Sequence, residues 1–180
     1  MTLFPLLDGL SDVELQAAEL DGECYRLGDG FLPIGMTPTV ESRAAAAIGA
    51  RPTRLVAALG TAAWVWGAAD RFPARSEYLV ALDARWRPPA TERAHIVESV
   101  LRPGDVVRFG GAIVTSPLRT AIDLARFRAE FGSVERTAVH ALAHVGGFEL
   151  TDALAAMDRG RNLSGKRAAA ARLRAALSPS

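Results

Sequence analysis

An arginine and an aspartate stand four residues apart, Arg119 and Asp123, in the stretch GGAIVTSPLRTAIDLARF. On a helix this spacing brings a cation and a carboxylate onto one face. Three interpretations are open: a reactive pair, a contact for a partner through Arg119, or the charged edge of a buried helix. The surrounding sequence indicates a short strand that runs directly into a helix. Thr115 or Ser116 is expected to cap that helix, and Pro117 suits its first turn because proline needs no hydrogen bond there.

The distribution of charge around this helix favours the third interpretation. A helix over residues 117–131 places Arg119, Asp123, Arg126 and Glu130 in one narrow sector, because each residue turns the chain by about 100°. Apolar side chains fill most of the remaining circumference. We therefore expect a core helix whose charges line its one exposed edge.

Two histidines offer a second set of reactive side chains. His140 and His144 are separated by four residues, as zinc ligands on a helix often are. The intervening ALA supplies no glutamate for a metalloprotease, and no cysteine lies nearby. We expect neither a metal nor another cofactor at this position.

Other catalytic motifs are absent from the sequence. There is no G-x-S-x-G nucleophile elbow and no glycine-rich phosphate loop of either usual pattern. Cys24, the only cysteine, lies in an acidic segment, which disfavours its thiolate. Because no nucleophile, base and electrophile come together, we expect no catalytic residues and no enzyme.

Charge is unevenly distributed between the two ends of the chain. Residues 1–42 contain eight acids and one arginine, a net charge of −7, whereas residues 159–180 contain six bases and no acid. This indicates an acidic partner for the basic tail, or contact between the two ends. A solvated terminal helix is the alternative, since cations also suit a helix C-terminus. The candidate contacts to nucleic acid or a partner are Arg159, Arg161, Lys166, Arg167, Arg172 and Arg174.

The N-terminal segment predicts one helix followed by a hairpin. Ser11 and Glu14 form a capping-box pattern before an apolar helical run. The runs ECYRL and FLPI flank GDG, whose glycines permit a tight turn. A helix followed by a hairpin is the outline of the end of a winged-helix unit. We expect a degenerate winged-helix-like segment over residues 1–38 and a second unit over residues 39–180.

The second unit predicts an α+β fold with a helix-rich C-terminal half. TPTVESRAAAAIGA is a helix closed by Gly49, and LGTAAWVWGA is a helix capped by Thr61. The β-like runs EYLVAL, AHIVESV, DVVRF and AIVTS suggest a small antiparallel sheet of three or four strands. Helices follow in PLRTAIDLARFRAEF, in SVERTAVHALAHV, which Gly146 and Gly147 end, in LTDALAAMD, and in SGKRAAAARLRAAL, capped by Ser164.

The compartment follows from what the sequence lacks. No apolar run approaches the roughly 18 residues of a membrane helix. The first residues carry no basic n-region, and a single cysteine allows no internal disulfide. We expect a cytoplasmic protein without membrane contact.

Taken together, three stretches resemble the AbiEi-type antitoxin family of type IV toxin–antitoxin systems in its actinobacterial form. They are LGTAAWVWGA, RPGDVVRFGGAIVTSPLRTAIDLARF and RGRNLSGKRAAAARLRAAL, in that order. The resemblance covers about residues 50 to 177, and relatives with this core can continue into a Vsr-like endonuclease domain. The most distinctive element, which is mainly structural, comprises Thr115, Ser116, Pro117, Arg119, Thr120 and Asp123.

The resemblance implies an antitoxin that neutralises a nucleotidyltransferase-like toxin and represses its own promoter through a winged helix. Residues 11–34 leave room for one helix and a hairpin only, and phosphates would repel their negative charge. We therefore expect any DNA contact from Arg43 onward. The leading hypothesis is a non-catalytic antitoxin or regulator. The alternatives are a DNA-binding transcriptional regulator without a toxin-related role, or a catalytically dead remnant of a nuclease-bearing relative.

Overall fold

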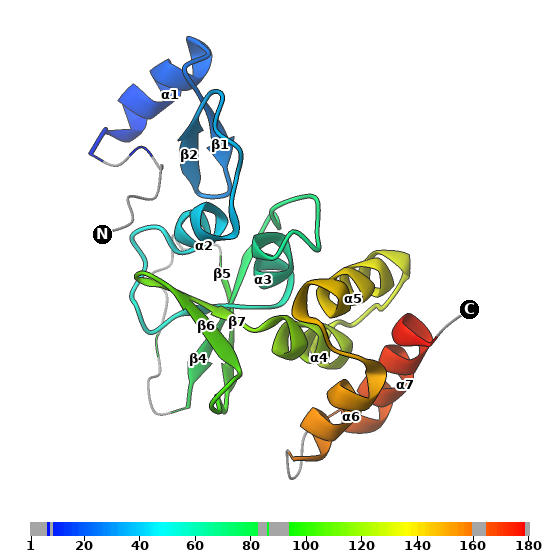
Figure 1. Cartoon of the computed structure of the whole chain (residues 1–180). Helices are drawn as coiled ribbons and strands as arrows, with labels where there is room; N and C mark the ends of the chain where they lie inside the picture. The colour runs from blue at the N-terminus through cyan, green and yellow to red at the C-terminus, as the bar shows by residue number, and fades with distance from the viewer. Residues whose placement is uncertain (1–6, 8, 83–85, 87–93, 160–164, 179–180) are drawn as a thin grey trace.

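The computed structural model describes residues 7, 9–82, 86, 94–159 and 165–178, and Figure 1 shows helices around two sheets. The helices are α1 (Asp12–Leu20), α2 (Val40–Ile48), α3 (Leu59–Val65), α4 (Pro117–Phe127), α5 (Ser133–Gly146), α6 (Leu150–Asp158) and α7 (Lys166–Leu177). The strands are β1 (Cys24–Leu27), β2 (Gly30–Pro33), β3 (Val56–Ala57), β4 (Ser76–Ala81), β5 (Ala94–Ser99), β6 (Val106–Phe109) and β7 (Ala112–Thr115). The predicted α+β class with a helix-rich C-terminal half is confirmed.

The N-terminal segment contains α1 and the antiparallel pair β1–β2, as predicted. The side chain of Ser11 accepts a hydrogen bond from the backbone N–H of Glu14, and the carboxylate of Glu14 accepts one from Ser11. Leu15, Cys24 and Phe31 form a small core between the helix and the hairpin. Figure 1 shows α1 and α7 at opposite ends of the molecule, so the acidic and basic ends of the described chain do not touch.

The larger sheet has five strands in the order β5-β4-β3-β7-β6, and it corrects the expected antiparallel arrangement. β6 and β7 are antiparallel across Gly110 and Gly111, but β4 runs parallel to β5, and β3 runs parallel to β7. The sequence feature that indicates parallel strands is the length of the connection between Ala81 and Ala94, which is twelve residues. A connection of that length permits the crossover that parallel strands require, whereas a hairpin needs only a few residues.

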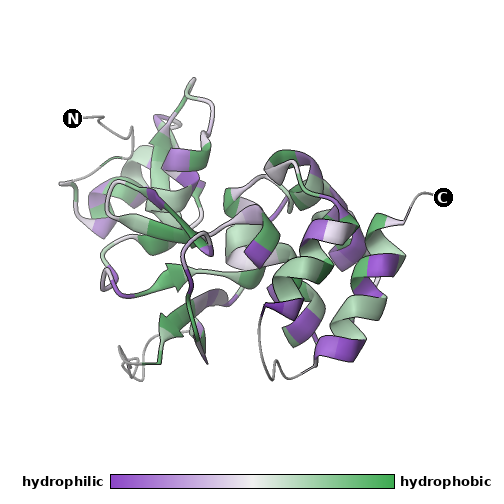
Figure 2. Cartoon of the chain, turned by 60° about the horizontal axis from the view of Figure 1, so that its bottom comes forward, coloured by the Kyte–Doolittle hydropathy of each residue, from purple (hydrophilic) through white to green (hydrophobic). Residues whose placement is uncertain are grey.

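Both faces of the central strands β3, β4 and β7 are buried. On β4, Leu79 belongs to one hydrophobic core, while Tyr78 and Val80 belong to the other. The first core lies toward α4–α7, and the second lies toward α2 and the hairpin. Figure 2 accordingly shows the strands coloured mainly as hydrophobic, with hydrophilic positions recurring along the C-terminal helices.

Three predicted helix boundaries differ from the structure. The backbone before α3 has no side-chain cap, and Thr61 instead accepts a hydrogen bond from the N–H of Glu77, joining α3 to β4. α4 ends at Phe127 rather than at residue 131, because the next residue, Arg128, has an extended backbone. The N-cap position of α7 is Gly165, whereas Ser164 lies outside the described residues.

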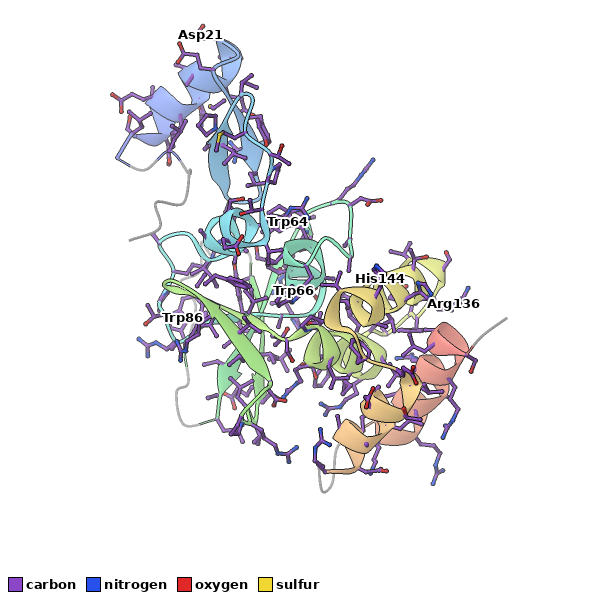
Figure 3. All side chains as sticks on the ribbon, in the orientation of Figure 1. Asp21, Trp64, Trp66, Trp86, Arg136 and His144 are labelled. Atoms are coloured by element: carbon purple, nitrogen blue, oxygen red, sulfur yellow. The ribbon has the colours of Figure 1, made fainter. Side chains whose placement is uncertain are left out.

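The tryptophans within and directly after α3 have structural roles. Trp64 is buried and meets the ring of Phe72 edge to face, with ring centroids 4.8 Å apart. The indole N–H of Trp66 donates to the carbonyl of Thr115 at 2.8 Å, so α3 is attached to the end of β7. Figure 3 shows both side chains next to α3. Among the described helices, none combines the length and apolar character needed to cross a bilayer.

Candidate functional site

The junction between β7 and α4 is built as the sequence predicts. Ser116 is the N-cap residue of α4, and its hydroxyl accepts a hydrogen bond from the backbone N–H of Arg119. Pro117 occupies the first turn, where its missing N–H costs nothing. The hydroxyls of Thr115 and Thr120 are 2.7 Å apart, and Thr120 also donates to the carbonyl of Ser116 at 2.9 Å. These contacts fix the direction in which α4 leaves the sheet.

Arg119 connects α4 to two segments that precede it in the sequence. Its Nε donates to Oδ2 of Asp123 at 2.7 Å, and one terminal nitrogen bonds Oδ2 of Asp105. The same nitrogen donates to the carbonyl of Val100 at 3.1 Å, while the other donates to the hydroxyl of Ser99 at 2.7 Å. One guanidinium thus joins the helix, the end of β5 and the loop before β6.

The expected exposed edge of α4 is wrong at these positions. Arg119 is only 9 % exposed and Asp123 is fully buried. The helical periodicity placed the two side chains on one face correctly, but β5 and the loop before β6 cover that face. Arg126 completes the group through a longer contact of 3.4 Å to Asp123. Glu130 lies beyond the end of α4 and is exposed, so it makes no pair on that helix.

Burial sets the electrostatics of this group. The pKa of Asp123 is raised above its ordinary value because the carboxyl is removed from water. The charges of Arg119 and Arg126 act in the opposite direction, and a hydrogen bond from Arg119 does the same. Burial also lowers the pKa of Arg126. Two arginines and two carboxylates, with Asp105 as the fourth member, therefore form a compact charge-balanced network that holds elements together.

A cleft of about 570 Å³ opens beside this network. Its walls come from the end of β5, the loop over residues 102–105, one side of α4 and the C-terminal turn of α6. Ser116, Arg119 and Arg126 line it from α4, and Arg159 lines it from the end of α6. The family-motif element and the start of the basic tail are therefore neighbours in space.

The predicted basic residues of the tail have different environments. Arg159, Arg167 and Arg174 are exposed, whereas Arg161 lies outside the described residues. The ammonium of Lys166 is 2.8 Å from a carboxylate oxygen of Asp158.

Arg172 has an intramolecular role that the sequence pattern did not indicate. It is partly buried and donates to the carbonyls of Ala125, Arg128 and Ala129 at 2.8–3.2 Å. Its guanidinium also lies over the ring of Phe131. Arg172 thereby satisfies carbonyls at the C-terminal end of α4, which lack partners within the helix.

His140, His144 and Cys24 do not line the cleft beside α4. His140 and His144 are exposed on α5, where Figure 3 labels His144. No group of three or more histidine, cysteine or acidic side chains in the described part of the chain is arranged to hold a metal. Cys24 is buried, and burial together with the charges of Glu19 and Glu23 raises the pKa of its thiol.

Sequence reasoning missed a second ion pair, which is partly buried. Glu77 on β4 and Arg128 after α4 form two parallel hydrogen bonds of 2.6 Å. The N–H of Gly60 donates to the same carboxylate at 2.8 Å. These residues are far apart in the sequence, and no short motif connects them. Leu59, which directly precedes Gly60, has a positive φ of 51°, which is uncommon for a residue with a side chain.

Comparison with known proteins identifies the family. The sequence model described as the AbiEi antitoxin C-terminal domain matches residues 55–177, which is more than half of the chain. No curated protein matches. One similar solved structure is the crystal structure of the RV2827C protein from Mycobacterium tuberculosis, with 14 % identity and a TM-score of 0.39, covering 93 % of this chain and 69 % of that one. A domain of the matched family supports a role as an antitoxin or regulator. The chain belongs to the AbiEi antitoxin family.

Proposed function

We propose that this protein is a non-catalytic antitoxin that counteracts a nucleotidyltransferase-like toxin through a binding surface. The family match over residues 55–177 carries the proposal. The internal geometry supports it, because Arg119 and Asp123, the pair most suggestive of chemistry, are bonded to each other and to neighbouring groups. A buried network of this kind stabilises a shape and leaves no free base or nucleophile at its centre.

The exposed face of α7 is our candidate for the contact surface. Arg167 and Arg174 are seven residues apart, which brings them to nearly the same side of the helix. Both are exposed, whereas Ala169 and Leu173 of the same helix are buried against α4 and α5. We propose that these two arginines contact an acidic surface of the toxin. Arg172 is excluded from this role by its hydrogen bonds to α4.

Repression of its own operon is a second proposed activity. The described N-terminal helix, α1, carries Asp12, Glu14 and Glu19 and no basic residue, so it is poorly suited to approach DNA phosphates. Figure 3 places Asp21 at the end of α1 that lies farthest from the larger sheet. We propose that DNA, where it is bound, is contacted from Arg43 onward. We also propose that the chain divides into an N-terminal segment over residues 1–38 and a domain over residues 39–180.

Co-expression with a nucleotidyltransferase-like toxin from the same genome tests the principal proposal. The wild-type chain should restore growth, and the double variant Arg167→Gln/Arg174→Gln should restore it less. The matched control is Arg54→Gln/Arg108→Gln, which removes two exposed charges elsewhere and should rescue fully. Equal rescue by both double variants would exclude α7 as the contact surface. Failure of the wild-type chain to rescue would exclude the antitoxin role toward that toxin.

A salt-titrated shift assay on the protein's own promoter tests repression separately. A specific complex should weaken steeply with salt if arginines contact phosphates. Absence of a specific complex at moderate salt removes the repressor activity and leaves the antitoxin proposal intact.

A further inference from the structure

The cleft beside α4 has a size typical of small-ligand sites. Its volume of about 570 Å³ falls within the roughly 300–1,000 Å³ of most such pockets. Three segments far apart in the sequence form its walls: the end of β5 with the following loop, α4, and the end of α6. The charged residues that line it are Glu98, Arg102, Asp105, Arg119, Arg126 and Arg159.

The positive charges of the cleft exceed the negative ones. Among the described residues, four arginines and two acids line it, and the carboxylate of Asp123 lies behind its wall, so the arginines outnumber the carboxylates by one. Inside, Arg119 and Arg126 are balanced by Asp105 and by Asp123 behind the wall. The unbalanced charge therefore lies nearer the mouth of the cleft.

Two of the lining arginines, with Glu98, lie outside this balanced group. Arg102 and Arg159 are exposed. Neither guanidinium has a hydrogen-bond or ion-pair partner among the residues that the structure describes. The first turn of α4 also reaches the cleft at Ser116, and the positive end of the helix dipole adds to the attraction for an anion.

The wall between the charged groups is apolar. Leu118, Ile122 and Phe127 line the cleft from α4, and Met157 lines it from α6. Ile122 and Met157 are also part of the main hydrophobic core, so this wall is held rigidly. A ligand that satisfies the whole cleft needs an anionic group at the mouth and an apolar body against this wall.

We propose that the cleft binds a small organic phosphate monoester with an aromatic or apolar body. A phosphate monoester presents three strong acceptor oxygens, enough for both exposed guanidiniums to bind it together, whereas a carboxylate presents only two. Arg102 and Arg159 bind the phosphate, and the partly exposed Leu118 and Phe127 contact the body. Arginine suits this role because its planar guanidinium can donate two parallel hydrogen bonds to two oxygens of one phosphate. The inference is independent of the proposed antitoxin function.

Isothermal titration of the full chain with phenyl phosphate tests the proposal. We expect one site per chain and tighter binding than for inorganic phosphate, which lacks the apolar body, or for benzoate, which offers two acceptor oxygens in place of three. Arg102→Gln and Arg159→Gln should each weaken binding by about tenfold or more, as expected for a lost charge-assisted hydrogen bond. Both residues are exposed, so circular dichroism should show an unchanged fold. Arg54→Gln, at an exposed position outside the cleft lining, should leave binding unchanged.

Several results would overturn the proposal. Phenyl phosphate that binds no better than inorganic phosphate would show that the apolar wall takes no part. Binding that is equal in Arg159→Gln and the wild type would place the anion elsewhere. Tighter binding of benzoate would change the ligand class to carboxylates. If a short oligonucleotide binds, phenyl phosphate does not, and Arg102→Gln weakens the oligonucleotide, the cleft mouth is a nucleic-acid contact instead.

Discussion

Replacing Arg119 with methionine removes one guanidinium from the buried network and leaves Asp123, Asp105 and Arg126 in place. Methionine has a similar length and fills much of the space, so the principal change is the loss of charge and hydrogen bonds. Asp123 is fully buried and would keep only the 3.4 Å contact to Arg126. Asp105 is partly exposed and can be hydrated, so it contributes less to the loss. Breaking a buried ion pair by removing one partner costs about 3–5 kcal/mol. Because Arg126 still offsets part of the charge of Asp123, we expect Arg119→Met to lower the unfolding free energy by an amount near the lower end of this range.

The pH dependence of this loss distinguishes an electrostatic cause from poor packing. Because burial raises the folded-state pKa of Asp123, the folded protein binds more protons than the unfolded chain between the two pKa values. Stability therefore falls as pH rises through that interval. Without Arg119 the pKa of Asp123 rises further, so the interval widens. The difference in unfolding free energy between wild type and Arg119→Met should be larger at about pH 7 than at about pH 4.5.

Urea denaturation followed by circular dichroism at both pH values is the assay. A second variant, Arg119→Met/Asp123→Asn, removes the stranded carboxylate and should be more stable than Arg119→Met alone, since an amide is cheaper to bury than an unpaired charge. A loss at pH 7 below about 1 kcal/mol, the range of exposed pairs, would refute the buried network. A loss of equal size at both pH values would assign the effect to packing.

Two further predictions concern how the helices are attached to the sheet. A Cβ at Gly60 would lie 2.7 Å from an oxygen of Glu77 and 2.7 Å from the guanidinium paired with it. Gly60→Ala should therefore lower the unfolding free energy measured by chemical denaturation by about 1–3 kcal/mol. Gly111→Ala is the control and should be nearly neutral, because a Cβ there would meet open space. Leu173→Ala, in the buried face of α7, should lower the unfolding free energy by about 2–5 kcal/mol, whereas Leu20→Ala, 88 % exposed, should change it by less than about 0.5 kcal/mol.

Local chemistry allowed much of the fold to be predicted from the sequence. Ser11 with Glu14 and Ser116 with Pro117 cap their helices as expected, and Gly49 and Gly147 end theirs. These features depend on residues within a few positions of each other, which the sequence displays directly. The motif around Thr115–Asp123 also indicated the family that the comparison confirmed.

The tertiary structure alone decided the roles of the charged residues on α4 and α7. Helical periodicity shows that Arg119 and Asp123 share a face, but what covers that face depends on Ser99 and Asp105, brought there by the sheet. Likewise, Arg172 looks like any solvated cation until α7 lies against the end of α4. A side chain's periodicity is a local property, whereas its burial and its partners follow from contacts between segments distant in the chain. For that reason the sequence defined the elements and the family, and only their packing distinguished the buried network from the exposed charges.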